Sequence, residues 1–162
     1  MTQNDYKYAV VDLEATGTGS SAKIIQIGIV LIENGCITKT YETDVNPHEE
    51  LDEHIKELTG LDDERLGRAP EFSQVAAEVY ELIQDAIFVA HNVKFDANLL
   101  AEALFWEGFE LLTPRVDTVE LAQVFYPTFD KYALGNLCEL LEIPLENAHT
   151  ALADAQATAQ LF

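Results

Sequence analysis

Basic residues are scarce in this sequence. Its 162 residues include 9 Lys and Arg against 29 Asp and Glu, which gives a formal net charge of −20 at pH 7. Proteins that hold the backbone of a nucleic acid usually carry a basic surface, because neutralised phosphates release condensed counterions. The composition therefore argues against tight binding along a polynucleotide. It fits a protein that binds cations, or a module whose affinity for nucleic acid is supplied by a neighbouring region.

Cysteine is also rare, and long apolar runs are lacking. Cys36 and Cys138 belong to no CxxC or Cys/His pattern, so we expect neither a disulfide nor a structural zinc site. No stretch approaches the roughly 18 uninterrupted apolar residues of a membrane span. The N-terminus shows no basic region leading into an apolar core, as a secretory signal would. We expect a cytoplasmic domain with no membrane partner.

The length and composition fit one domain. With 162 residues, 48% of them hydrophobic, the chain can bury a single good core. It contains no internal repeat, low-complexity tract or linker. The sequence stops in a helical pattern at Gln160 to Phe162 without a polar tail. We therefore expect residues 1–162 to be a single domain that is a fragment of a longer multidomain protein.

Apolar runs and turn signals predict β-structure in the first third of the chain. Asn34-Gly35 between two apolar runs is the strongest short-range hairpin signal. Gly28, inside a predicted strand, indicates either a bulge or a close approach of another backbone. The expected strands in this part are residues 8–13, 24–32 and 37–45.

After Pro47 the pattern becomes helical, with two short apolar strands between the helices. Phe72, Val75 and Val79 recur at helical spacing, for example. The expected helices are residues 51–58, 72–82, 96–106, 118–125, 134–141 and 150–162, and the expected strands are 87–90 and 115–117. A hairpin-connected meander followed by alternating strands and helices predicts an α/β fold with a mixed five-stranded sheet flanked by helices.

Acidic residues stand at strand ends and helix starts. Asp12 and Glu14 are two residues apart at the end of the first strand, so both side chains point to the same side. Asp96 opens a helix just after a short buried strand. Asp154 follows His149 by five residues, where a loop enters the last helix. Open α/β sheets gather ligands at such positions, so these segments could converge.

Four convergent carboxylates without a basic partner would repel one another. Hard divalent cations relieve this repulsion, since Mg²⁺ prefers oxygen ligands. The arrangement suits two-metal phosphodiester hydrolysis, in which one ion lowers the pKa of the attacking water and the other stabilises the leaving 3′ oxygen. His149, a side chain that titrates near neutrality, is the candidate general base for that water.

Three segments are similar to the motifs of the DnaQ-like (DEDDh) 3′→5′ exonucleases. Residues 12–17 (DLEATG) resemble the first motif and residues 91–96 (HNVKFD) the second. Residues 149–155 (HTALADA) resemble the third, in the form where histidine precedes aspartate by five residues. The one departure, Ala15 where Thr is common, touches no catalytic position. The resemblance spans residues 8–161 and implies an RNase H-like fold, two Mg²⁺ or Mn²⁺ ions and release of nucleoside 5′-monophosphates from 3′ ends.

The same resemblance implies roles for individual residues. Asp12, Glu14 and Asp154 would hold the more tightly bound metal ion, and Asp12 would bridge to the second. Asp96 would support the second ion directly or through water, and His149 would be the catalytic base. The residues implied in substrate binding are Leu13, Thr16 and Gly17, through the backbone around them, and His91, Asn92 and Phe95.

Within the family, residues 8–98 most resemble the N-terminal exonuclease domain of DinG-type helicases of Gram-positive bacteria. The proofreading subunit or domain of a replicative polymerase is the nearest alternative. The implied partners are 3′ ends of single-stranded nucleic acid, DNA rather than RNA, and a covalently attached C-terminal helicase-type region. A short-RNA exonuclease is the alternative within enzymes. A non-hydrolytic module that regulates an attached helicase predicts loss of one of the five key residues, and all five are present.

Several residues near the motifs have structural interpretations as well. Asp117, just before a helix, fits an N-cap better than a functional role. Asn92 fits a turn as well as a substrate contact, and Phe95 fits the core as well as a stacking position for a base. Candidate loop or surface residues are His48 and His54, candidate phosphate contacts are Lys94 and Lys131, and candidate core or partner-surface residues are Phe105, Trp106 and Phe109.

Overall fold

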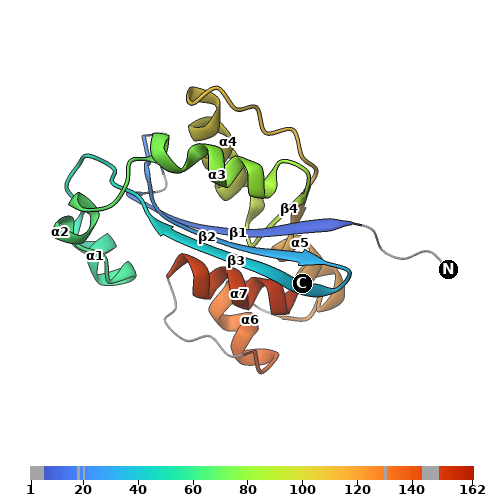
Figure 1. Ribbon diagram of the computed structural model, residues 1–162. Helices are drawn as coiled ribbons and strands as arrows, with labels where there is room; N and C mark the ends of the chain where they lie inside the picture. Colours follow the sequence, from blue (N-terminus) through green and yellow to red (C-terminus); the bar gives the residue numbers. More distant parts are fainter. Residues whose placement is uncertain (1–5, 18, 20, 130, 144–149) are drawn as a thin grey trace.

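A mixed sheet forms the centre of the fold (Figure 1). The structure is a computed structural model, and it describes residues 6–17, 19, 21–129, 131–143 and 150–162. The strands are β1 (Lys7–Ala15), β2 (Ile24–Glu33), β3 (Cys36–Asp44), β4 (Ile87–Ala90) and β5 (Arg115–Asp117). The five strands lie in the order β3-β2-β1-β4-β5. β1, β2 and β3 form an antiparallel meander, whereas β4 pairs parallel to both β1 and β5. The predicted mixed five-stranded sheet is confirmed.

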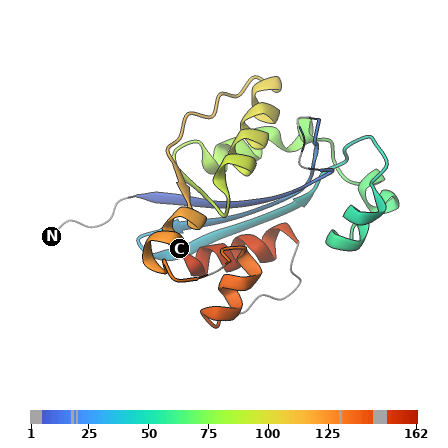
Figure 2. The same ribbon diagram turned by 180° about the vertical axis from the view of Figure 1, so that it is seen from behind.

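Helices cover both faces of this sheet. They are α1 (Glu53–Thr59), α2 (Asp63–Gly67), α3 (Phe72–Ile83), α4 (Val93–Trp106), α5 (Thr118–Phe125), α6 (Leu134–Leu140) and α7 (Ala151–Leu161). In Figure 1, α3 and α4 lie above the sheet, α6 and α7 lie below it, and α1 and α2 stand at one end; Figure 2 shows the same layers from behind. None of the helices in the described part of the chain is long and apolar enough to cross a membrane.

Local sequence signals account for most element boundaries. The Asn34-Gly35 hairpin is confirmed, with φ angles of 53° and 76° that a type I′ turn requires. Gly60 ends α1 in a left-handed conformation with φ 74°. The sequence predicted one short helix in this region and missed α2, in which the N-cap Asp62 accepts a hydrogen bond from the Arg65 N–H. α4 begins three residues earlier than predicted, directly after the left-handed Asn92.

Strand alternation divides the core into two layers. Ala9, Val11 and Leu13 of β1 belong to the large apolar cluster under α3 and α4. Val10 belongs to the smaller cluster that includes Ala155 of α7. Because side chains alternate along a strand, the residues that continue the Val10 series, two and four positions on, face α7. These residues are the acidic pair of the first sequence motif.

Gly28 sets the distance between β2 and α7. It pairs with Asp12 in the β1–β2 register. A Cβ atom on Gly28 would lie 2.3 Å from the carbonyl carbon of Ala151 and 2.4 Å from the backbone nitrogen of Leu152. Of the two interpretations of Gly28, the close backbone approach is therefore the one found. The first turn of α7 rests directly on β2, beside the acidic end of β1.

Gly28→Ala is expected to destabilise the protein by at least about 3 kcal/mol, the upper end of ordinary overpacking, because backbone atoms block the new methyl group. Urea unfolding followed by circular dichroism measures the change. Gly135→Ala is the matched control, since Gly135 lies in the first turn of α6 with open space around it and alanine favours a helix. A Gly28→Ala midpoint equal to that of the wild type would contradict the close approach.

Candidate metal centre

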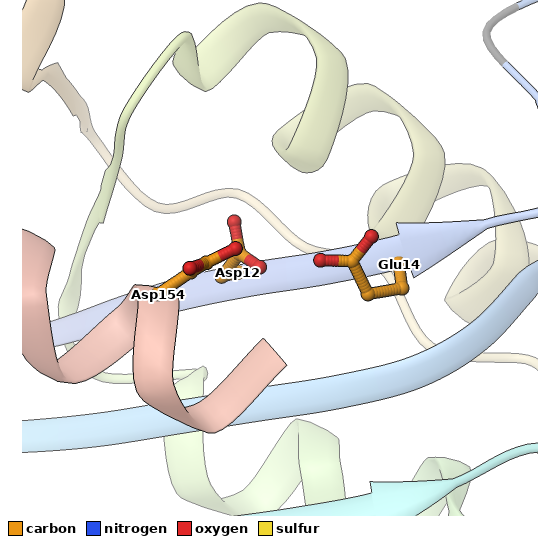
Figure 3. A group of neighbouring side chains, drawn as sticks. All are labelled: Asp12, Glu14 and Asp154. Carbon is orange, nitrogen blue, oxygen red and sulfur yellow. The ribbon is translucent and has the colours of Figure 1, made fainter. Parts of the chain in front are cut away.

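Three carboxylates converge between β1 and α7. Asp12 and Glu14 come from alternate positions of β1, and Asp154 comes from the first turn of α7 (Figure 3). One carboxylate oxygen of each lies within 4.8 Å of those of the other two. Asp154 is buried, and Asp12 and Glu14 are half-buried. The predicted convergence of these three acids is therefore present in the fold.

Asp96 is anchored beside this group from the other face of the sheet. It lies in the first turn of α4 with a side chain only 4% exposed. Its Oδ1 accepts a 3.1 Å hydrogen bond from the backbone N–H of Leu13, the residue between the two acids of β1. The fourth carboxylate therefore adds its negative charge to the same site, although it is not one of the three that meet within 4.8 Å.

The acids are arranged at an electrostatic cost. Burial raises the pKa of Asp12 well above its usual value, and the charges of Asp96, Asp154 and Glu14 raise it further. Burial and the charges of Asp154 and Asp96 raise the pKa of Glu14 to about 8. Burial also raises the pKa of Asp96, against the lowering effect of the Leu13 hydrogen bond. Fixed like charges this close favour protonation or the binding of a cation.

The donor set fits a hard divalent cation. The Oδ2 atom of Asp12 is buried and has no hydrogen-bond partner among the described residues. None of the ion pairs between described residues involves Asp12, Glu14 or Asp96. A buried carboxylate oxygen without a partner is costly. Carboxylate oxygens are the ligands that Mg²⁺ and Mn²⁺ take, so a metal ion would satisfy this oxygen and relieve the repulsion.

Two hydrogen bonds join the residue after β1 to the residue before β2. Thr16 donates its backbone N–H to the Lys23 carbonyl at 2.9 Å, and its Oγ1 accepts from the Lys23 N–H at 2.9 Å. Gly17 follows, half-buried. The Leu13 side chain lies in the core, so only the backbone of this residue faces the site. His149, the predicted base, lies outside the described residues.

His91 is held by hydrogen bonds at both ring nitrogens. Its Nε2 lies 2.6 Å from the carbonyl oxygen of Tyr132, which only accepts, so Nε2 carries a proton. Its Nδ1 lies 2.8 Å from the Oγ1 of Thr118. Burial lowers the pKa of His91, which favours the neutral ring, with Thr118 donating to Nδ1. His91 thus ties the Tyr132 segment to the end of β4.

Asp117 organises the neighbouring turn. Its Oδ1 accepts from the Val119 N–H at 2.9 Å, which confirms the predicted N-cap of α5. The same atom accepts from the Asn92 N–H, also at 2.9 Å. Asn92 is left-handed, with φ 67°, and thus has the backbone of a turn residue. Its side chain is exposed, and the substrate contact stays a prediction.

Two hollows follow α4 away from the acids. The first, of about 380 Å³, is lined by Gly19, by Asn92 just before this helix, and by Phe95, Asn98 and other residues of the helix. The second, of about 460 Å³, shares Leu99 and Glu102 with the first and extends to Trp106. Neither is lined by any of the four acids.

The large aromatic residues at the end of α4 differ in their surroundings. Phe105 is 65% exposed and Trp106 is 76% exposed, so the core interpretation is wrong for both. Phe109 packs on Tyr80 and the main core, as a core residue does. Lys94 and Lys131 are exposed. His48 lies in a loop and pairs with Glu71, and His54 is exposed on α1, as expected.

Sequence patterns gave no role to Gln26. It is 1% exposed inside an apolar strand, and its Oε1 accepts from the Ala151 N–H at 2.7 Å. A lone amide within the run IIQIGIVLI was the available signal, because a buried amide needs hydrogen-bond partners. Its partners lie 18 and 125 residues away in the chain, so the fold alone reveals them.

Known proteins resemble this chain in sequence and in fold. The chain matches the family described as Exonuclease (RNase_T) over residues 9–162, and it belongs to that family. It is 42% identical over 157 residues to a protein of Staphylococcus haemolyticus (strain JCSC1435) named 3′-5′ exonuclease DinG. That match covers 96% of this chain and 17% of the relative, so the chain spans about a sixth of its length. The resemblance inferred from the motifs is confirmed.

Solved structures show the same architecture. E. coli exonuclease I in complex with a dT13 oligonucleotide superposes with a TM-score of 0.86 at 17% identity, over 96% of this chain and 40% of that one. The nuclease domain of 3′hExo, a DEDDh family member bound to rAMP, gives 0.81 at 17% identity, over 99% and 92%. The predicted RNase H-like fold is confirmed.

Glu14→Gln is expected to stabilise the metal-free protein at high pH. The pKa of Glu14 is raised to about 8 in the fold, so the stability it contributes is present below about 4.5 and is lost as pH rises to about 8. The variant never pays this penalty. In EDTA its advantage over the wild type in urea unfolding should therefore grow between pH 4.5 and pH 8 and then level off.

Mn²⁺ should reverse this order, because it binds the ionised wild-type site. Glu81→Gln, on the exposed side of α3, is the control for loss of one negative charge. A Glu14→Gln variant no more stable than the wild type at pH 8 in EDTA would contradict the electrostatic cost of the site.

Proposed function

We propose that the domain is a metal-dependent 3′→5′ exonuclease. It would hydrolyse phosphodiester bonds at the 3′ ends of single-stranded nucleic acid, DNA in preference to RNA, and release nucleoside 5′-monophosphates. The observation that carries the proposal is the convergence of Asp12, Glu14 and Asp154 in a member of the exonuclease family. The relative named 3′-5′ exonuclease DinG supports the polarity, and the dT13 complex of E. coli exonuclease I supports a DNA substrate.

The four acids would divide the metal binding between them. Asp12, Glu14 and Asp154 would hold one ion, with Asp12 shared with a second, and Asp96 would support the second ion directly or through water. Two Mg²⁺ or Mn²⁺ ions bound there would lower the pKa of the attacking water and stabilise the charge on the leaving 3′ oxygen. His149, five residues before Asp154 in the chain, would take the proton of the attacking water.

The terminal nucleotide would lie between the loop after β1 and the start of α4. Thr16 and Gly17 would approach it through the backbone, and Phe95, at the nearer hollow, would stack against a base. Asn92 would contact the nucleotide through its exposed side-chain amide. His91 would act indirectly, because both its ring nitrogens are bonded within the protein.

The net charge of −20 supports binding of only the end of a nucleic-acid strand. Two bound divalent ions would remove part of this charge at the site, and the remaining excess still disfavours capture of a long phosphate backbone. A covalently attached helicase-type region would supply affinity for the polymer. The relative that is about six times longer than the matched segment supports this proposal. The proposed location is the cytoplasm, without a membrane partner.

A short-RNA exonuclease is the second candidate. The structural similarity to the rAMP-bound nuclease domain of 3′hExo favours it. Recognition of RNA depends on contacts to the 2′-hydroxyl. Matched DNA and RNA oligonucleotides of one sequence, compared by kcat/KM, distinguish the two candidates. A third candidate, a non-hydrolytic module that binds 3′ ends and regulates a helicase, predicts binding without cleavage.

A 5′-labelled single-stranded DNA oligonucleotide incubated with Mg²⁺ or Mn²⁺ should shorten stepwise from its 3′ end. EDTA should abolish the ladder. Asp12→Ala should slow it by more than about 100-fold, beyond the usual cost of losing a metal's outer-shell partner, because a direct ligand is lost. Glu81→Gln should behave as the wild type. Intact DNA and RNA with both metals, together with 3′-end binding, would favour the non-hydrolytic module.

Binding of single-stranded DNA by the Asp12→Asn variant, which should not cleave it, should depend weakly on salt. For single strands the slope of log K against log salt is about −0.7 per phosphate contact, so two or three contacts give about −2 or shallower. Fluorescence anisotropy measures the slope between about 50 and about 300 mM salt, a range around the physiological ionic strength. A much steeper slope would show many phosphate contacts and contradict end-focused binding.

A further inference from the structure

Gln26 joins the meander to the last helix. Its Nε2 donates to the Oδ1 of Asp44 at 2.9 Å, and its Oε1 accepts from the Ala151 N–H at 2.7 Å. The carboxylate of Asp44 can only accept when ionised and the Ala151 N–H can only donate, so the orientation of the amide is fixed by its partners. A side chain that is 1% exposed thus has both functional groups bonded.

Asp44 is in turn held by α2. The Nε of Arg65 lies 2.6 Å from the Oδ2 of Asp44, and Nη2 lies 3.0 Å from Oδ1. This is a bidentate arginine–carboxylate pair, which fixes the orientation of the Asp44 carboxylate as well as its distance from Arg65. Arg65 itself comes from a supported element, because Leu66 packs with Ile25 in a small separate core. The contacts run without a break from α2 through Asp44 and Gln26 to the start of α7.

We call this series of contacts, from Arg65 through Asp44 and Gln26 to Ala151, the relay. It ends three residues before Asp154, a proposed metal ligand. Ala151 is the first residue of α7, and Asp154 donates its backbone N–H to the Thr150 carbonyl in the same turn. In the sheet, Glu14 pairs with Gln26 as Asp12 pairs with Gly28. The two acids of β1 therefore stand opposite the two β2 residues that contact the start of α7.

Gln26 also does what a helix cap does. The first N–H groups of a helix have no partner within the helix. The side chain of the N-cap residue Thr150 makes no capping hydrogen bond to α7, and the Ala151 N–H is satisfied instead by Gln26 from the neighbouring strand. A cap supplied by the sheet fixes the helix to the sheet. A cap supplied from within the helix would not.

We propose that Gln26 is a positioning residue of the metal centre, holding α7 so that Asp154 stays within reach of Asp12 and Glu14. Asp44 and Arg65 would keep the Gln26 amide in place. Gly28 sets how closely α7 approaches, and Gln26 sets where along β2 the helix begins. The proposal rests on the proposed metal-dependent function, and it concerns which residue aligns the ligands.

Mn²⁺ affinity, measured by electron paramagnetic resonance on the whole protein, tests the proposal directly. Gln26→Leu keeps the approximate volume and removes both hydrogen bonds. It should weaken Mn²⁺ binding by about 10-fold or more, as loss of a ligand-orienting partner does. On an oligonucleotide it should lower kcat and leave KM nearly unchanged. Arg65→Met, at an exposed position and therefore expected to fold, should shift both quantities in the same direction by less.

Val79→Ala is the matched control. Val79 is fully buried under the opposite face of the sheet, so the variant loses stability without touching the relay. It should bind Mn²⁺ as the wild type does. Wild-type affinity in folded Gln26→Leu, or in Arg65→Met if Gln26→Leu does not fold, would overturn the proposal. So would an equal loss of affinity in Val79→Ala.

The same measurement keeps the two proposals apart. A wild-type protein that binds Mn²⁺ but cleaves neither DNA nor RNA would overturn the exonuclease proposal, while the Mn²⁺ affinities of the variants would still decide the role of Gln26. A wild-type protein that binds no Mn²⁺ would overturn both.

Discussion

The first turn of α7 rests on the backbone of β2 at Gly28, where any side chain would meet the carbonyl group of Ala151. This contact brings the last segment of the chain against the first two strands. In the same region, a carboxylate oxygen of Asp154 lies within 4.8 Å of those of the acidic pair on β1. The hairpin at Asn34-Gly35 and the alternation of β1 contribute to the site only because α7 is held at this distance.

The site is costly for the protein that carries it. Carboxylates are gathered where burial and mutual repulsion raise the pKa of Asp12 and Glu14, and one oxygen of Asp12 has no hydrogen-bond partner among the described residues. Functional sites commonly violate the rules that the rest of a fold obeys. Here the large apolar cluster lies under α3 and α4, and Asp12, Glu14 and Asp154 lie on the face of the smaller cluster, at α7.

Hydrogen bonds between distant segments complete the arrangement. Asp117 caps α5 and fixes the turn at Asn92, and His91 joins β4 to the Tyr132 segment. Gln26 joins the meander to α7. Each of these polar side chains satisfies backbone groups that would otherwise be left without partners. The elements around the site are thus held by polar contacts as well as by apolar packing.

Short-range signals were enough to predict much of the fold. The strand at 87–90 and the helix at 118–125 have the predicted bounds, because their apolar runs end at clear turn or capping residues. The helix α2 was missed because five residues are too few to show a period. Phe105 and Trp106 were open to a core interpretation because hydrophobic residues are often, but not always, buried.

Three features could be predicted from the sequence: the strand alternation that points Asp12 and Glu14 to one side, the hairpin at Asn34-Gly35, and the motifs that mark the exonuclease family. Three contacts depend on the folded chain: the meeting of Asp154 with this acidic pair, the hydrogen bond from the Leu13 N–H to Asp96, and the hydrogen bond from the Ala151 N–H to Gln26. The difference lies in the sequence separation of the interacting residues. Alternation and turns depend on neighbouring residues, whereas these contacts join residues 83 and 125 positions apart, which only packing brings together.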